Sequence, residues 1–153
     1  MSEKTEELKE LWQTAMYREV AANAFYTAGI EKTDDPGAKA LLKDLAAAET
    51  SHYVLLEKYR ERGKIRKSRQ QVKDLMQSEY LASGGTTLEG AGLQDTLLYA
   101  IKREQESIDF YSRMTGIMTA IEGKELCERL TTEELKHKVR IELLYERLFL
   151  KEG

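Results

Sequence analysis

The sequence predicts an all-α protein, a four-helix bundle made of two repeated helical hairpins with one long crossover between the second and third helices. Two observations support this prediction. Apolar residues recur at steps of three and four along four long segments, and an ungapped repeat at an offset of 85 residues, from Glu49 to Glu134, relates the two halves. With 153 residues, one proline and 41% hydrophobic residues, the chain fits a single helix-rich domain spanning residues 1–153.

The first two predicted helices form a hairpin. The first begins after Ser2, a good N-cap, and ends near Gly29, which suits the position just past a helix. The segment 33–36 (Thr, Asp, Asp, Pro) predicts a turn with a capping Asp and a proline in the first turn of the second helix, which ends near Gly63. The inward residues are predicted to be Trp12, Ala15, Met16, Glu19, Ala22 and Tyr26, and then Leu42, Leu45, Glu49, His52, Leu56 and Tyr59.

The helical pattern lapses between residues 64 and 92. This connection opens with a basic run at 64–69 and closes with a glycine-rich segment at 83–92. Between them, a short helix is predicted with Val72, Leu75, Met76 and Tyr80 on one face. A connection of this length can run the full height of the molecule, so the third helix need not be antiparallel to the second, which is a one-crossover topology.

The second hairpin repeats the first. Its opening helix is expected to fray around Thr115 and Gly116, and the final helix to start at about Ile121. Both helices again show alternating steps of three and four. The inward residues are predicted to be Leu97, Ala100, Ile101, Glu104, Ser107, Ile108 and Tyr111, and then Cys127, Leu130, Glu134, His137, Ile141, Leu144 and Leu148.

Both histidines of the chain, His52 and His137, follow a glutamate by three positions, Glu49 and Glu134. Residues at i and i+3 lie one turn apart on the same helix face, so a carboxylate oxygen and an imidazole nitrogen can converge on one ion. The offset of 85 residues also aligns one further glutamate of each half. These two residues, each 30 positions before the Glu-x-x-His glutamate, are Glu19 and Glu104.

Four inward carboxylates at mid-helix would be costly in an apolar bundle, because each buried unpaired charge costs about several kcal/mol and like charges add to it. No Lys or Arg lies on the predicted inward stripes, so bound cations are the expected remedy. Four carboxylates and two neutral imidazoles balance two divalent ions. Oxygen and nitrogen ligands without sulfur suit iron or manganese better than structural zinc.

In these motifs the chain resembles a rubrerythrin-type member of the ferritin-like di-iron carboxylate proteins, over essentially its whole length. The resemblance implies a ferritin-like bundle with two iron ions, manganese or a mixed pair being the alternative. It implies Glu19 and Glu104 as terminal carboxylates, Glu49 and Glu134 as bridging carboxylates, and His52 and His137 as terminal imidazoles. Two tyrosines, each seven residues after a terminal glutamate, match family tyrosines that hydrogen-bond near the metals and are the catalytic candidates: Tyr26 and Tyr111.

Two departures from the family pattern qualify this resemblance. Rubrerythrins have an extra carboxylate one turn after the third-helix ligand, where this chain has Ser107. The redox-linked exchange between that carboxylate and a histidine is therefore in doubt, and His52 is expected to stay on the metal. Rubrerythrins also carry a rubredoxin domain with two CxxC pairs, whereas this chain has a single cysteine, Cys127. Electrons are expected from a separate donor, such as a rubredoxin-like protein.

The resemblance implies an enzyme, a di-iron peroxidase that reduces hydrogen peroxide and acts against oxidative stress. The alternatives left open are a dioxygen-activating oxidase or ferroxidase, and an iron-binding or storage protein. A redox sensor or a scaffold with a vestigial site is disfavoured by the complete ligand set.

Composition excludes several other classes. A net charge of −3 gives no special attraction to nucleic acid or membrane, and no disulfide framework can form from one cysteine. No apolar run is long enough to span a bilayer, and the N-terminus has no apolar signal region. The expected location is the cytoplasm, and the expected assembly is a homo-oligomer, a dimer.

Overall fold

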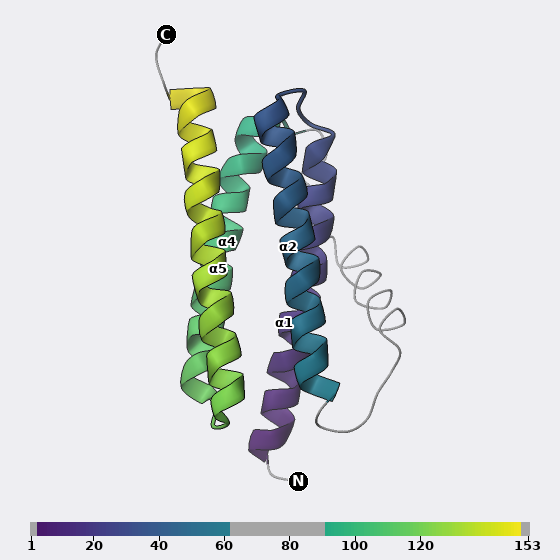
Figure 1. Cartoon of the computed structure of the whole chain (residues 1–153), viewed down its shortest axis with the longest axis vertical. Coiled ribbons are helices and arrows are strands. Elements are labelled where there is room, and N and C mark those ends of the chain that lie inside the picture. The colour runs from purple at the N-terminus through teal and green to yellow at the C-terminus, as the bar shows by residue number, and fades with distance from the viewer. Residues whose placement is uncertain (1–2, 62–90, 151–153) are drawn as a thin grey trace. The chain divides into compact units, whose positions relative to one another are not determined.

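The computed structural model describes residues 3–61 and 91–150. Within these ranges the chain is all-α, without strands, and has the predicted four-helix bundle fold. The predicted connection at 64–92, with its basic run, its short helix and nearly all of its glycine-rich segment, lies outside the described residues. The four long helices are α1 (Glu3–Ile30), α2 (Pro36–Glu61), α4 (Leu93–Ile117) and α5 (Ile121–Tyr145), and a single π-helical turn, η1 (Glu146–Leu150), follows α5 (Figure 1).

The chain divides into two compact units. Unit 1 comprises Met1–Ala28 and Asp44–Thr87, which include most of α1 and most of α2. Unit 2 comprises Gly29–Lys43 and Leu88–Gly153, which include the α1–α2 turn, the first turns of α2, and the α4–α5 hairpin.

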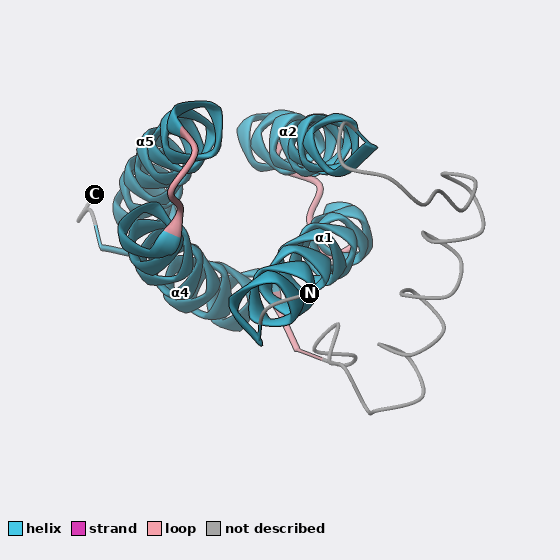
Figure 2. Cartoon of the chain, turned by 90° about the horizontal axis from the view of Figure 1, so that it is seen from below, coloured by secondary structure: helices cyan, strands magenta, loops and turns pink. Residues whose placement is uncertain are grey.

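In unit 1, α1 and α2 lie side by side, and specific bonds fix their alignment (Figures 1 and 2). Near one end, the indole Nε1 of Trp12 donates a hydrogen bond of 2.8 Å to the backbone carbonyl of Leu56. The Trp12 ring also lies 4.7 Å from the ring of Tyr59, measured between centroids. Further along, the side-chain amide of Asn23 bonds to the backbone of Ala46. These contacts set the register of the first hairpin.

In unit 2, α4 and α5 pack along their length as an antiparallel hairpin (Figure 2). The ammonium group of Lys138 on α5 donates to the side-chain oxygen of Gln105 on α4 at 2.9 Å. Close to the far end of the hairpin, the amide of Gln94 donates to the hydroxyl of Tyr145 at 3.0 Å. The core between the two helices holds apolar residues that are fully or nearly fully buried, namely Leu97, Ala100, Phe110, Tyr111, Met114, Cys127, Leu130, Ile141 and Leu144.

The start of α2 belongs to unit 2 and is capped as predicted. The carboxylate of Asp35 accepts a hydrogen bond of 2.8 Å from the backbone N–H of Ala38, and it also accepts one of 3.0 Å from the guanidinium of Arg147 in η1. Beside this cap, Lys32 donates to the backbone carbonyl of Ala91, two residues before α4. Helices α2 and α4 therefore begin at the same end of unit 2, which is the direction that a one-crossover topology requires.

Several details differ from the sequence-based predictions. Helix α1 continues to Ile30, so Gly29 lies in its last turn and not past its end. Helix α4 remains regular through the expected fraying point and ends at Ile117. At the C-terminus, the α-helix changes to the π-helix η1, which has more residues per turn and shifts the register. Leu148 is consequently half-buried instead of buried, and the other inward predictions that are only half-buried are Tyr59, Ile101, Ser107 and Ile108.

Candidate metal centre

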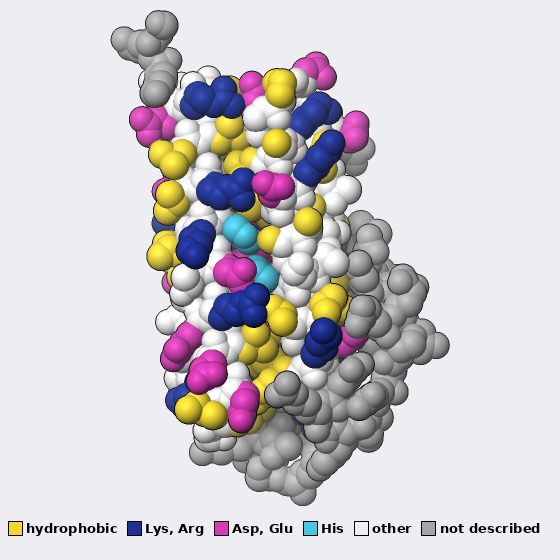
Figure 3. Space-filling view, in the orientation of Figure 1, with side chains coloured by type: hydrophobic (Ala, Val, Ile, Leu, Met, Phe, Trp, Pro, Cys, Tyr) yellow, Lys and Arg dark blue, Asp and Glu magenta, His cyan; other side chains and the backbone are white. Residues whose placement is uncertain are grey.

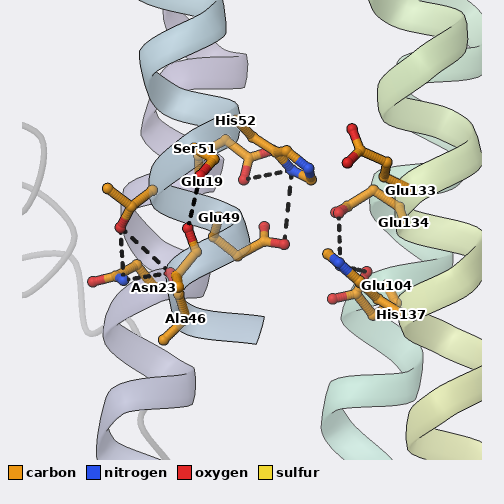
Figure 4. Close-up of polar contacts among 12 residues, drawn as sticks. Glu19, Asn23, Ala46, Glu49, Ser51, His52, Glu104, Glu133, Glu134 and His137 are labelled. Carbon is orange, nitrogen blue, oxygen red and sulfur yellow. Dashed lines mark hydrogen bonds and ion pairs between the residues drawn. The ribbon is translucent and has the colours of Figure 1, made fainter. Parts of the chain in front are cut away.

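Unit 1 holds a buried triad formed by Glu19 of α1 with Glu49 and His52 of α2. Each of the three residues is at most 2% exposed. The imidazole Nδ1 of His52 lies 3.6 Å from a carboxylate oxygen of Glu19 and 3.8 Å from one of Glu49. One ligand atom from each residue lies within 4.8 Å of the other two. Both carboxylates are directed toward the imidazole (Figure 4), so the three side chains can converge on one ion.

Unit 2 holds the equivalent triad, formed by Glu104 of α4 with Glu134 and His137 of α5. The two carboxylates are at most 2% exposed and His137 is 8% exposed. Nδ1 of His137 lies 3.1 Å from an oxygen of Glu134 and 3.9 Å from one of Glu104 (Figure 4). One ligand atom of each residue again lies within 4.8 Å of the other two. The predicted site residues of this half are therefore brought together.

The helices position both triads in the same way. Each Glu-x-x-His pair lies one turn apart on the inward face of the second helix of its hairpin, and the inward face of the first helix supplies the other glutamate. In both units it is the Nδ1 atom of the histidine that lies among the carboxylate oxygens. The repeat in the sequence is thus a repeat in the geometry of the donor atoms within each unit.

The donor set fits a divalent cation. Each triad has two carboxylates and one neutral imidazole, and one divalent ion balances the charge of the two carboxylates. Without a cation or a proton, buried carboxylates at this spacing repel each other. Oxygen and imidazole donors are those of iron and manganese sites. The Glu/His triads can therefore hold metal ions.

The only cysteine contributes nothing to this donor set. Cys127 is fully buried on α5, and its thiol is absent from the groups of side chains with ligating geometry within the described ranges. Burial raises the pKa of the Cys127 thiol to about 11, with a smaller contribution from the charge of Glu128. Metals bind the thiolate form, so a raised pKa is the opposite of what a ligand requires.

The two catalytic candidates, Tyr26 and Tyr111, are both 1% exposed. Each packs edge-on against the preceding phenylalanine, with ring centroids 5.5 Å apart for the pair Phe25 and Tyr26 and 5.5 Å apart for the pair Phe110 and Tyr111. Each tyrosine follows the first-helix glutamate of its triad by seven residues, which places it two turns away on the same face. The aromatic pairs, like the triads, occur in both units.

Asn23, which is half-buried, and Glu57, which is buried, are polar residues that were not predicted to lie inward. Asn23, one turn after Glu19, donates from its amide to the carbonyl of Ala46 at 2.8 Å and to the hydroxyl of Thr50 at 3.0 Å (Figure 4). These two bonds hold α1 against α2 beside Glu49. The sequence gives no sign of this role, because other polar residues would fit the pattern at this position equally well. Glu57 is 3% exposed and lies outside the groups with ligating geometry among the described residues. The sequence pattern gives no sign that Glu57 is buried, because its neighbour Leu56 takes the inward position.

No helix in the described part of the chain combines the length and apolar character needed to cross a membrane. On the face that Figure 3 shows, lysine and arginine side chains are interspersed with acidic ones and with apolar ones.

Comparison with known proteins gives the fold and no family. No protein-family model matches the chain, and no curated protein matches it. A solved structure of a hypothetical protein from Pyrococcus furiosus is similar, with a TM-score of 0.73 and 23% sequence identity. The match covers 95% of this chain and 92% of that one. This likeness shows a shared fold.

Proposed function

We propose that the protein is a non-haem di-iron oxidoreductase that reduces hydrogen peroxide to water, in the manner of rubrerythrin-type peroxidases. The observation that carries the proposal is the duplicated buried triad of two glutamates and one histidine, one in each unit. A single triad would suit one metal ion of many kinds. Two copies of the same oxygen and nitrogen donor set, related by an ungapped repeat, favour a paired centre.

We propose that the two triads bind a pair of iron ions together, with manganese or a mixed pair as the alternative. Glu19 and Glu104 would hold the ions as terminal carboxylates, and Glu49 and Glu134 as bridging carboxylates, which are the roles that the resemblance implies. When bound, a ferrous pair supplies two electrons to hydrogen peroxide, which with two protons yields two molecules of water.

The residues of the chain bind the ions, orient the donors and exclude water. His52 and His137 are assigned as the terminal imidazoles, held in place by the inward faces of α2 and α5. The low exposure of all six side chains keeps bulk water from competing for the donor atoms. Low local polarity also strengthens the attraction between the carboxylates and a cation.

Tyr26 and Tyr111 are assigned as proton donors or hydrogen-bond donors to the centre. A phenolic hydroxyl can give up a proton and recover it, and a buried one finds a hydrogen-bond partner. The edge-on packing of Phe25 and Phe110 restricts rotation of the tyrosine rings.

Ser107 bears on how the centre behaves when its oxidation state changes. This residue is half-buried on α4, one turn after Glu104, where rubrerythrins have an additional carboxylate. Without that carboxylate, the donor set is the same in both units. We propose that each ion keeps its imidazole throughout turnover, and that the protein lacks the ligand exchange of rubrerythrins. The electrons come from a separate donor protein.

The decisive experiment combines metal analysis with rapid mixing. The purified protein is loaded with ferrous iron, its iron content is measured, and its oxidation by hydrogen peroxide and by dioxygen is followed separately by stopped-flow absorbance. We expect about two irons per chain and faster oxidation by peroxide. Faster oxidation by dioxygen, with mineral formed from added iron, would instead identify a ferroxidase or iron-storage protein.

A second measurement tests whether the two ions form a pair. Magnetic susceptibility and electron paramagnetic resonance of the ferric protein report exchange coupling, which requires two irons joined by shared ligands. Coupled spins are expected. Two uncoupled ferric signals would show that each triad binds an ion independently, and the paired centre would be rejected even if both triads bind iron.

A further inference from the structure

Helix α5 has a second apolar face that its own core does not use. Three apolar side chains spaced by four residues are exposed, Leu135 by 50%, Val139 by 45% and Leu143 by 60%. We call these three residues the outer stripe. At 3.6 residues per turn they lie on one side of the helix, and apolar side chains line the edge of the molecule along α5 in Figure 3.

The outer stripe lies opposite the buried face of α5. The buried residues Leu130, Glu134, His137, Ile141 and Leu144 follow the alternating three and four spacing of the core, and the helical angle puts their mean direction on the far side from the outer stripe. Isolated exposed leucines are ordinary on protein surfaces. The outer stripe differs, because its three exposed apolar residues lie on consecutive turns of a helix whose opposite face is already buried. Such an arrangement is typical of a binding surface.

The charges beside the outer stripe are separated by sign. On one border, Lys136 and Arg140 each follow a stripe residue by one position and are exposed. On the other border, Glu142 is exposed. Lys138 also lies on this second border, but its ammonium group bonds to Gln105 on α4 and so turns away from the stripe.

We propose that the outer stripe is the interface between two copies of this chain, paired with their α5 helices parallel. A two-fold axis running along the helices places the basic border of one copy opposite the acidic border of the other, so that Arg140 faces Glu142 of the second copy. A two-fold axis across the helices would place like borders together and cause repulsion. The apolar stripe supplies the attraction, and the borders select the orientation.

The experiment uses the full chain and measures self-association by sedimentation over a range of concentrations. Wild type is expected to dimerise, and Val139→Lys to weaken the dimer at least about tenfold, because a lysine would be buried without a partner. Leu98→Lys is the matched control, since Leu98 is 46% exposed on α4 away from the stripe, and it should leave the dimer unchanged. Circular dichroism of each variant checks that the fold is retained.

A charge exchange tests the orientation. Arg140→Glu should weaken the dimer, and the double variant with Arg140→Glu and Glu142→Arg should restore it, because opposite borders would again carry opposite charges. Monomeric wild type at all concentrations, or a dimer indifferent to Val139→Lys, would overturn the interface. A dimer broken by Val139→Lys but not rescued by the exchange would overturn the parallel arrangement.

Discussion

Nδ1 of His137 lies 3.1 Å from Oε1 of Glu134, one helical turn earlier in α5. The corresponding distance between His52 and Glu49 in unit 1 is 3.8 Å. The two Glu-x-x-His pairs thus have the same design with a tighter contact in unit 2. In both pairs the same imidazole nitrogen is next to the carboxylate, so the two donor atoms can bind one cation.

Glu134→Ala should therefore lower the amount of metal that the protein binds while leaving the fold intact. Loss of even an outer partner of a metal ligand lowers affinity about 10- to 100-fold, and loss of a ligand should cost at least as much. The matched control is Glu133→Ala, the adjacent glutamate, which pairs with Arg129 at 3.2 Å outside the triad. Iron content measured after dialysis should fall for Glu134→Ala and stay at the wild-type value for Glu133→Ala.

Asn23→Ala should lower the stability of the protein, because it removes both hydrogen bonds that join α1 to the backbone of Ala46 and the hydroxyl of Thr50. We expect a loss of about 1–3 kcal/mol in the free energy of unfolding, measured with urea. Gln105→Ala is the control. It removes the contacts of an amide on the α4 surface with Asp109 and Lys138, and it should lower the free energy of unfolding by less than Asn23→Ala does. An Asn23→Ala variant as stable as wild type would show that these two bonds do not hold α1 against α2.

The sequence was sufficient for the features that depend on periodicity. The inward stripes of α1 and α5 could be predicted because helical spacing determines which residues share a face, and the repeat identified Glu19 and Glu104 as partners of the two Glu-x-x-His pairs. Features that depend on packing were missed. The position of a neighbouring helix decides the burial of Glu57, the hydrogen bonds of Asn23 and the half-burial of Ile101. The turn η1 depends on how α5 ends.

Asp35→Asn should weaken the link between the start of α2 and η1. The hydrogen bond from the backbone N–H of Ala38 lowers the pKa of the Asp35 carboxyl, and the guanidinium of Arg147 lowers it further. A carboxyl whose pKa is lower in the folded state stabilises the protein above its unfolded pKa, near 3.8, and this stabilisation is lost as the pH falls through the lower folded value.

The expected result for Asp35→Asn is a lower melting temperature near neutral pH, with a difference from wild type that shrinks in acid. Asp34→Asn is the control, because Asp34 is the exposed neighbour in the same turn. Melting curves at several pH values between about 2 and 7 compare the three proteins. A difference that grows as the pH falls would contradict the assigned direction of the pKa shift.

Cys127 should resist thiol reagents in the folded protein. Its side chain is fully buried in the core of unit 2, and burial raises the pKa of its thiol to about 11. Because only the thiolate attacks such reagents, and little thiolate forms at neutral pH, labelling should require unfolding. The rate of reaction with a disulfide reagent at pH 8 should rise steeply when urea is added, in step with the unfolding transition seen by circular dichroism. Rapid labelling without urea would mean that the inward face of α5 opens locally, and since that face also carries Glu134 and His137, the triad of unit 2 would then be accessible to water.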